Sequence, residues 1–164
     1  MCVFAVLSQP VLAIDPDAQA IDLEIAAAPK ALAVSSKDVG CLADAIYFEA
    51  RGEPEMGQEA VAQVILNRAA SGVYPKSVCG VVYQNQHRRN ACQFSFACDG
   101  KPEVKNEAKA WRRAQRIARE MADGTKQVPA LQTATHYHAT YVKPRWASKL
   151  KKLETIGRHV FYRE

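Results

Sequence analysis

Glu49 is the residue of this sequence whose type and spacing best fit a catalytic acid. It shares a helix face with three apolar residues at helical spacing, Leu42, Ala45 and Ile46. A glycine and a proline follow closely and should end the helix, which places Glu49 in its last turn. Burial, the negative end of the helix dipole and repulsion from Glu53 would each disfavour the charged carboxylate. All three effects predict a raised pKa, which general-acid catalysis requires.

A structural role for Glu49 is the alternative to a catalytic one. A glutamate near a helix end is commonly solvated or paired with a cation, and Arg51 and Arg68 are available as partners. The spacing of the residues does not separate the two interpretations.

The charge distribution narrows the class of partner. The chain has 164 residues, enough for one domain with a real core, and a formal net charge of +5. Residues 1–40 contain two lysines and five acidic residues, so the basic excess lies in the remainder. A basic domain suggests nucleic acid, an anionic membrane or an anionic cell-wall polymer as partner. Nothing beyond charge indicates a surface that reads nucleic acid, so we expect no such partner.

The N-terminal residues resemble part of a secretory signal. Residues 1–13 contain an apolar run and end in a small-x-small pattern, although the basic start is missing. The run is too short and too interrupted to span a bilayer, so we expect export without stable membrane insertion. Residues 14–34 are rich in Ala, Asp and Pro and are predicted to be a flexible linker. Residues 35–164 then form the folded domain.

Cysteine usage agrees with export. Removal of a signal would leave four cysteines, Cys41, Cys79, Cys92 and Cys98, and an even number in an exported chain indicates two disulfides. Three pairings are possible, and we favour Cys92–Cys98 as a local link and Cys41–Cys79 as a long-range one. No C-x2-C pair is present, which argues against zinc.

The periodicity predicts a mainly helical α+β domain. Helices are expected over residues 35–50, 55–70 and 102–121, the last with Val104, Ala108 and Trp111 among its inward-facing residues. A loop-rich stretch lies between the second and third helices, with a short strand possible at Val81-Val82-Tyr83. The C-terminal part is aromatic and should form short extended segments.

Several polar and aromatic residues outside the helices could hold a sugar chain. The candidates for substrate binding are Tyr47, Gln93, Phe94, Ser95, His136, Tyr137, His138, Trp146 and Tyr162. His136 and His138 could also form a metal half-site with His159. No H-E-x-x-H helix or acidic cluster supports this, so we expect neither a metal nor a cofactor.

Several separate motifs, in the right order, resemble the SleB/CwlJ cell wall hydrolase family. The resemblance covers roughly residues 38–163. It is carried by AIYFEARGE (45–53), GQEAVAQVILNR (57–68), YP with CGVVYQ (74–84), CQFS (92–95), THYH (135–138) and IGRHVFY (156–162).

This resemblance implies a lysozyme-like, lytic-transglycosylase-related fold and action on peptidoglycan. It also implies that the first glutamate of E-A-R-G-E, here Glu49, is the catalytic acid. Several members degrade the spore cortex, but this sequence shows no separate peptidoglycan-binding repeat and has extra cysteines. We therefore expect a monomeric enzyme of a Gram-negative periplasm or cell envelope rather than a spore enzyme.

The expected reaction is cleavage between N-acetylmuramic acid and N-acetylglucosamine by a lytic transglycosylase. One glutamate can serve there as acid and then base, with Glu53 as a supporting acid that tunes it. A hydrolytic muramidase would use Glu49 with a second carboxylate, Glu53 or Asp99. A basic peptidoglycan-binding module without activity is the non-enzymatic alternative.

Overall fold

A computed structural model describes residues 34–88 and 91–164. The predicted signal remnant (1–13), and the predicted linker (14–34) except for Val34, lie outside the described residues. The helices are α1 (Ser36–Ala50), α2 (Glu55–Ala70), α3 (Val78–Val82) and α4 (Ala108–Ala122). The strands are β1 (His136–Ala139), β2 (Lys151–Ile156) and β3 (His159–Arg163). Three short 3-10 turns are η1 (Ser95–Ala97), η2 (Pro129–Leu131) and η3 (Ala147–Lys149).

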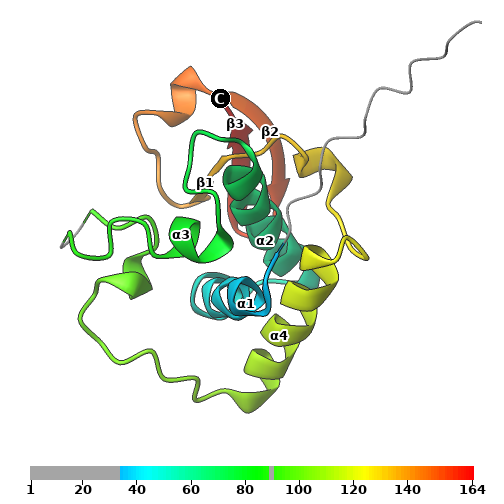
Figure 1. The fold of residues 1–164 in the computed structure, drawn as a ribbon. Helices are drawn as coiled ribbons and strands as arrows, with labels where there is room; N and C mark the ends of the chain where they lie inside the picture. The colour runs from blue at the N-terminus through cyan, green and yellow to red at the C-terminus, as the bar shows by residue number, and fades with distance from the viewer. Residues whose placement is uncertain (1–33, 89–90) are drawn as a thin grey trace, which may run out of the picture. The chain divides into compact units, whose positions relative to one another are not determined.

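Helix α1 is the central element of the helical part, where it contacts α2, α3 and α4 (Figure 1). Its start is fixed by Ser35, whose hydroxyl accepts a hydrogen bond from the Asp38 N–H at 3.1 Å. The predicted apolar face is confirmed, because Leu42, Ala45 and Ile46 have no exposed surface. The predictions of both α1 and α2 agree with the structure, since local patterns specify them.

The predicted strand at residues 81–83 is wrong. Val81 and Val82 belong to α3, and Tyr83 is its C-cap residue. The first turn of α3 is capped by the Ser77 hydroxyl, which accepts a hydrogen bond from the Gly80 N–H. The capping serine provides a local helix start that outweighs the β preference of the valines.

The third predicted helix begins later than expected. Helix α4 starts at Ala108, and Val104 is 56 % exposed instead of facing the core; Ala108 is exposed as well. Tertiary contacts hold the preceding segment in a non-helical form. The Glu107 N–H donates to the Tyr47 hydroxyl at 3.1 Å, and Lys105 pairs with Asp44 at 3.0 Å.

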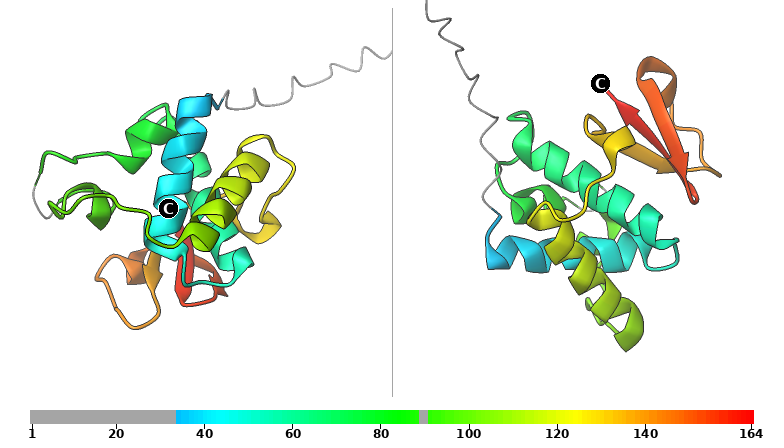
Figure 2. Two further views of the ribbon diagram at one scale, coloured as in Figure 1. Left: turned by 90° about the horizontal axis from the view of Figure 1, so that it is seen from below. Right: turned by 90° about the vertical axis from the view of Figure 1, so that its right-hand side faces the viewer.

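The three strands form one antiparallel sheet in the order β1-β3-β2. Seen from the side, this sheet is a separate layer beside the helices (Figure 2). Tyr137 of β1 lies opposite Phe161 of β3, which has no exposed surface and joins the core. The predicted mainly helical α+β class is confirmed. Within the described part of the chain, no helix is both long and apolar enough to cross a membrane.

Candidate active site

Glu49 lies in the last turn of α1, half-buried in the wall of a pocket of about 410 Å3. The pocket combines residues from α1, α2, the loop after α3 and β1. Its lining consists of Glu49, Arg68, Cys92, Gln93, Ser95, Cys98, Asp99 and Tyr137. The end of α1 therefore faces a cavity that contains polar groups suited to a polar ligand.

Burial raises the pKa of Glu49 to about 7. Neither Arg51 nor Arg68 forms an ion pair with Glu49. Arg51 pairs with Glu107 at 2.7 Å, and the Arg68 Nε donates to the Thr135 carbonyl at 2.6 Å. Among the described residues, no hydrogen bond or ion pair engages the Glu49 carboxyl group. A carboxyl group with this pKa and no protein partner can donate a proton to a bound ligand near neutral pH.

The Glu53 carboxylate is bound by Arg158. One carboxylate oxygen accepts a hydrogen bond from the Arg158 N–H at 2.8 Å, and the other accepts from the Arg158 Nε at 2.7 Å. Burial on its own would raise the pKa of Glu53, but these bonds and the charges of His159 and Arg158 lower it below its usual value. Arg158 compensates the charge of ionised Glu53, and the raised pKa of Glu49 is caused by burial and not by repulsion from Glu53.

The contact of Glu53 with Arg158 joins the turn after α1 to the turn between β2 and β3. Gly157 has a φ of +58°, and a Cβ atom there would collide with the Glu53 carboxylate. Glycine is thus required for the close approach. This contact ties the sheet to the helix that carries Glu49.

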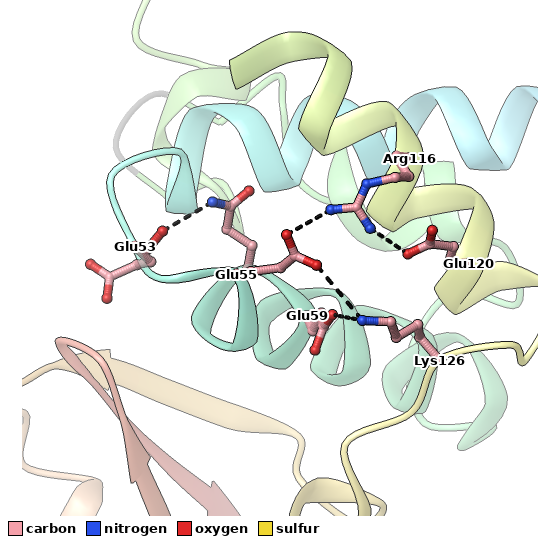
Figure 3. A network of polar contacts seen from close by, with 7 residues as sticks. Glu53, Glu55, Glu59, Arg116, Glu120 and Lys126 are labelled. Atoms are coloured by element: carbon pink, nitrogen blue, oxygen red, sulfur yellow. Dashed lines mark hydrogen bonds and ion pairs between the residues drawn. The ribbon is translucent and has the colours of Figure 1, made fainter. Parts of the chain in front are cut away.

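A second polar network holds the start of α2 in place (Figure 3). Arg116 of α4 pairs with Glu55 at 2.6 Å and with Glu120 at 2.7 Å, and Lys126 pairs with Glu59 at 2.9 Å. In the same view the Glu53 carboxylate points away from these ion pairs, toward the strands. One network therefore secures the turn after α1 and the other secures the start of α2.

The loop after α3 forms one wall of the pocket. Cys92 and Cys98 are joined by a disulfide, and both line the pocket together with Gln93, Ser95 and Asp99. The other disulfide, Cys41–Cys79, connects α1 to α3. The structure thus contains both of the favoured cysteine pairs. Asp99 brings to the pocket the second carboxylate that a hydrolase would need.

Tyr137 is positioned through the segment that precedes β1. Asn67 and Arg68 of α2 donate hydrogen bonds to main-chain carbonyls of Leu131, Ala134 and Thr135. Burial raises the pKa of Tyr137, and the nearby Glu49 charge adds to this effect. The phenol of Tyr137 thus stays protonated beside Glu49 and can serve as a hydrogen-bond donor.

Two of the predicted sugar-binding residues lie in the core. Tyr47 and Phe94 are each 2 % exposed. Phe94 packs near Phe96, with ring centroids 6.3 Å apart, and Tyr47 makes edge contacts with Phe48 and Trp111. Neither ring can contact a ligand in this structure, so we remove both from the set of candidates. In the segment 93–96 the side chains of Gln93 and Ser95 are exposed, whereas those of Phe94 and Phe96 are buried.

The remaining candidates form a separate group on the other face of β1. The rings of His136, His138 and Tyr162 lie 5.4 to 5.6 Å from the ring of Trp146. His138 Nε2 is 2.9 Å from the Tyr162 hydroxyl. None of these four residues lines the Glu49 pocket, because alternate residues of a strand face opposite sides. Within residues 34–88 and 91–164, no group of three or more His, Cys, Asp or Glu side chains could hold a metal ion.

The sequence indicates Arg68 only as a partner for Glu49, whereas the structure shows it as a buried residue of the pocket. It follows Val61, Val64 and Ile65 on the apolar face of α2. A charged residue on an apolar face was the signal that singled out Glu49. The same signal could have identified Arg68.

A family model for cell wall hydrolases matches residues 52–162. The chain belongs to the cell wall hydrolase family. Its relatives include a spore cortex-lytic enzyme of Halalkalibacterium halodurans, 31 % identical over 147 residues, and one of Bacillus subtilis, 31 % identical over 128 residues. These matches cover 89 % and 77 % of this chain but only 41 % and 38 % of the relatives. The chain thus spans well under half the length of either relative.

Two solved structures show the same fold as this family member. The catalytic domain of Bacillus cereus SleB matches with a TM-score of 0.63 and 30 % identity, covering 79 % of this chain and 92 % of that domain. The catalytic domain of germination-specific lytic transglycosylase SleB from Bacillus anthracis matches with a TM-score of 0.61 and 31 % identity, covering 79 % and 96 %. The described part of this cell wall hydrolase therefore has the fold of a SleB catalytic domain.

Proposed function

We propose that this cell wall hydrolase cleaves the glycan strand of peptidoglycan between N-acetylmuramic acid and N-acetylglucosamine, with Glu49 as the acid. The observation that carries the proposal is the position of Glu49 in the pocket, with a pKa near 7 and no partner for its carboxyl group among the described residues. The names of the relatives, spore cortex-lytic enzyme and lytic transglycosylase, support the substrate class.

A single carboxyl group can carry out both steps of a lytic transglycosylase reaction. Glu49 first gives its proton to the glycosidic oxygen as the bond to the anomeric carbon of muramic acid breaks. The resulting carboxylate then accepts the proton of the 6-hydroxyl group as that oxygen attacks the anomeric carbon. The product is a 1,6-anhydromuramic acid, and Glu49 ends protonated as it began. Glu53 is not available for either step, because Arg158 engages its carboxylate.

A hydrolytic muramidase is the second candidate, and the position of Asp99 favours it. Asp99 is exposed and lines the pocket with Glu49. In a hydrolase, Asp99 would activate a water molecule or stabilise the positive charge at the anomeric carbon. The product would then carry a free reducing end.

Mass spectrometry of soluble fragments from purified sacculi tests these proposals. Wild type, Glu49→Gln and Asp99→Asn would be incubated in parallel. Anhydro ends from wild type and Asp99→Asn, but not from Glu49→Gln, would support the transglycosylase. Free reducing ends that disappear in Asp99→Asn would support the muramidase. If wild type bound sacculi and released no fragments, the chain would be a binding module and the enzymatic proposal would be wrong.

We propose further that residues 35–164 form the catalytic domain and that it works as a monomer outside the cytoplasm. The two disulfides support an oxidising location. The relatives come from Gram-positive bacteria and are named as spore enzymes, so they do not support the expected Gram-negative periplasm or the expected absence of a spore role.

A further inference from the structure

Arg68 is a buried cation in the wall of the candidate active site. It is 4 % exposed and lines the same pocket as Glu49. Its Nε donates to the Thr135 carbonyl, and its guanidinium carbon lies 5.2 Å from the centre of the Tyr74 ring. Its Nη1 is buried and has no hydrogen-bond partner among residues 34–88 and 91–164. The guanidinium group is therefore held in place through Nε, while Nη1 is left without a partner in the described part of the chain.

No carboxylate of the described chain compensates this charge. Arg51, Arg116 and Arg158 each pair with a carboxylate within 2.7 Å, but they are much more exposed than Arg68. Burial lowers the pKa of Arg68, although an arginine remains charged in proteins. A buried charge without a counter-charge is costly, and strongly desolvated charges are enriched at functional sites. The anion that Arg68 lacks is thus expected from the ligand.

The proposed reaction also requires an anion at this place. Positive charge develops on the sugar ring when the glycosidic bond breaks. An unpaired guanidinium group in the same pocket would oppose that charge, and protonated Glu49 cannot offset it. A carboxylate of the substrate would neutralise Arg68 and would accept a charged hydrogen bond from the end of the guanidinium group that Thr135 does not engage. A hydroxyl or amide oxygen would satisfy the hydrogen bonds but not the charge.

The carboxyl group of the substrate that lies nearest to the cleaved bond is that of the lactyl substituent of muramic acid. This substituent is carried by the sugar ring whose glycosidic bond is cleaved. It is charged only when no stem peptide is attached, because the peptide is joined to it by an amide bond. We propose that Arg68 binds the free lactyl carboxylate of N-acetylmuramic acid, so that the enzyme acts on glycan chains without stem peptides. This inference rests on the proposed function. The reaction that supplies the substrate would be hydrolysis of the amide bond between the lactyl group and the stem peptide.

The test compares three substrates with the same glycan backbone. These are peptide-free chains, peptide-free chains whose lactyl carboxylates are converted to methylamides, and chains that retain their stem peptides. We expect wild type to cleave the peptide-free chains about 10–100-fold faster, in kcat/KM, than the methylamides, as loss of a charged hydrogen bond would predict. Equal rates on these two substrates would overturn the proposal without any mutant protein.

Variants of Arg68 connect the preference to this side chain. Arg68→Gln should cleave the peptide-free chains and the methylamides at similar rates, whereas Arg68→Lys should retain part of the preference through its charge. Arg112→Gln, at an exposed arginine of α4, is the matched control and should keep the full preference. A preference that survives in a folded Arg68→Gln would contradict the assignment of Arg68.

One further outcome would identify a different source of the carboxylate, and another would show that the proposed function itself is wrong. Faster cleavage of chains with stem peptides, lost in Arg68→Gln, would assign the anion to the peptide and overturn the lactyl proposal. If wild type cleaved none of the substrates, the proposed function would fail. Calorimetric binding of peptide-free chains and methylamides to wild type and Arg68→Gln would then still decide the role of Arg68.

Discussion

The last turn of α1 and the turn that follows it carry two glutamates with opposite properties. Glu49 has no protein partner among the described residues, and its pKa is raised to about 7. Glu53 is only 6 % exposed, yet its pKa is lowered because Arg158 donates two hydrogen bonds to it. Burial is therefore not sufficient to make a proton donor. The partners that accompany the buried carboxylate determine the direction of the shift.

The glutamates in these two turns also have different roles in the site. Glu49 faces the pocket, whereas Glu53 fastens the turn between β2 and β3 to the end of α1. Because β1 pairs with β3, this fastening also helps to hold Tyr137 of β1 beside Glu49. In these terms Glu53 is a positioning residue, and Glu49 is the residue proposed for chemistry.

The largest difference should appear in the rates. We expect Glu49→Gln to lose on the order of 10²–10⁴-fold in turnover, because it removes the proton donor. Glu53→Gln should lose less than about tenfold at a temperature at which it is folded, because it alters only a supporting contact. Release of soluble fragments from purified sacculi would measure both, with circular dichroism as a control of folding. If a folded Glu53→Gln variant were as inactive as Glu49→Gln, the assignment of Glu53 as a positioning residue and of Glu49 as the acid would be wrong.

The pH dependence of the wild-type rate should show the raised pKa of Glu49. The acid must be protonated, so kcat/KM should fall about tenfold per pH unit above about pH 7. An acid with an ordinary pKa would already give this decline above about pH 4.5. Rates measured with a soluble glycan between pH 5 and 9 would locate the decline, provided that the fold is unchanged over this range. A decline that begins near pH 4.5 would contradict the effect of burial.

Stability should change in opposite directions when each carboxylate is replaced. Glu53→Gln should lower the free energy of unfolding by about 1.5–3 kcal/mol, the usual contribution of a charged hydrogen bond. Glu49→Gln should raise it by roughly 1 kcal/mol at pH 8, because it removes an ionised group that burial disfavours. At about 1.4 kcal/mol per pKa unit, the shift from 4.5 to about 7 would correspond to about 3 kcal/mol, and screening by water in the pocket reduces this value.

The pH dependence of these two stability changes provides a control for their cause. A raised pKa in the folded state makes ionisation of Glu49 destabilising, and this cost grows as the pH rises from about 4.5 to about 7. The gain from Glu49→Gln should therefore be larger at pH 8 than at pH 5.5 in urea unfolding. The lowered pKa of Glu53 makes its contribution complete above its unfolded value, near 4.5, so the loss in Glu53→Gln should be equal at both values. A gain that did not grow with pH would indicate that Glu49 titrates normally.

The features that could be predicted from the sequence are those that local patterns determine. The apolar face of α1 located Glu49, and helix-start and helix-end signals gave the bounds of α2. The role of Glu53 could not be predicted, because its partner Arg158 lies 105 residues away in the sequence. The burial of Tyr47 likewise depends on distant contacts, with Trp111 and the Glu107 N–H. Tertiary contacts thus decided the roles that spacing left open.

The disulfide between Cys92 and Cys98 has a consequence for the shape of the site. It closes a short ring that carries Gln93 and Ser95, and Asp99 directly follows it. In a reducing compartment such a bond does not persist, and the ring is open. One wall of the pocket then loses its covalent restraint while the helical core retains its own packing. Formation of this disulfide therefore restrains the wall of the pocket that carries Gln93 and Ser95, so the shape of the site depends on the redox state of the two cysteines.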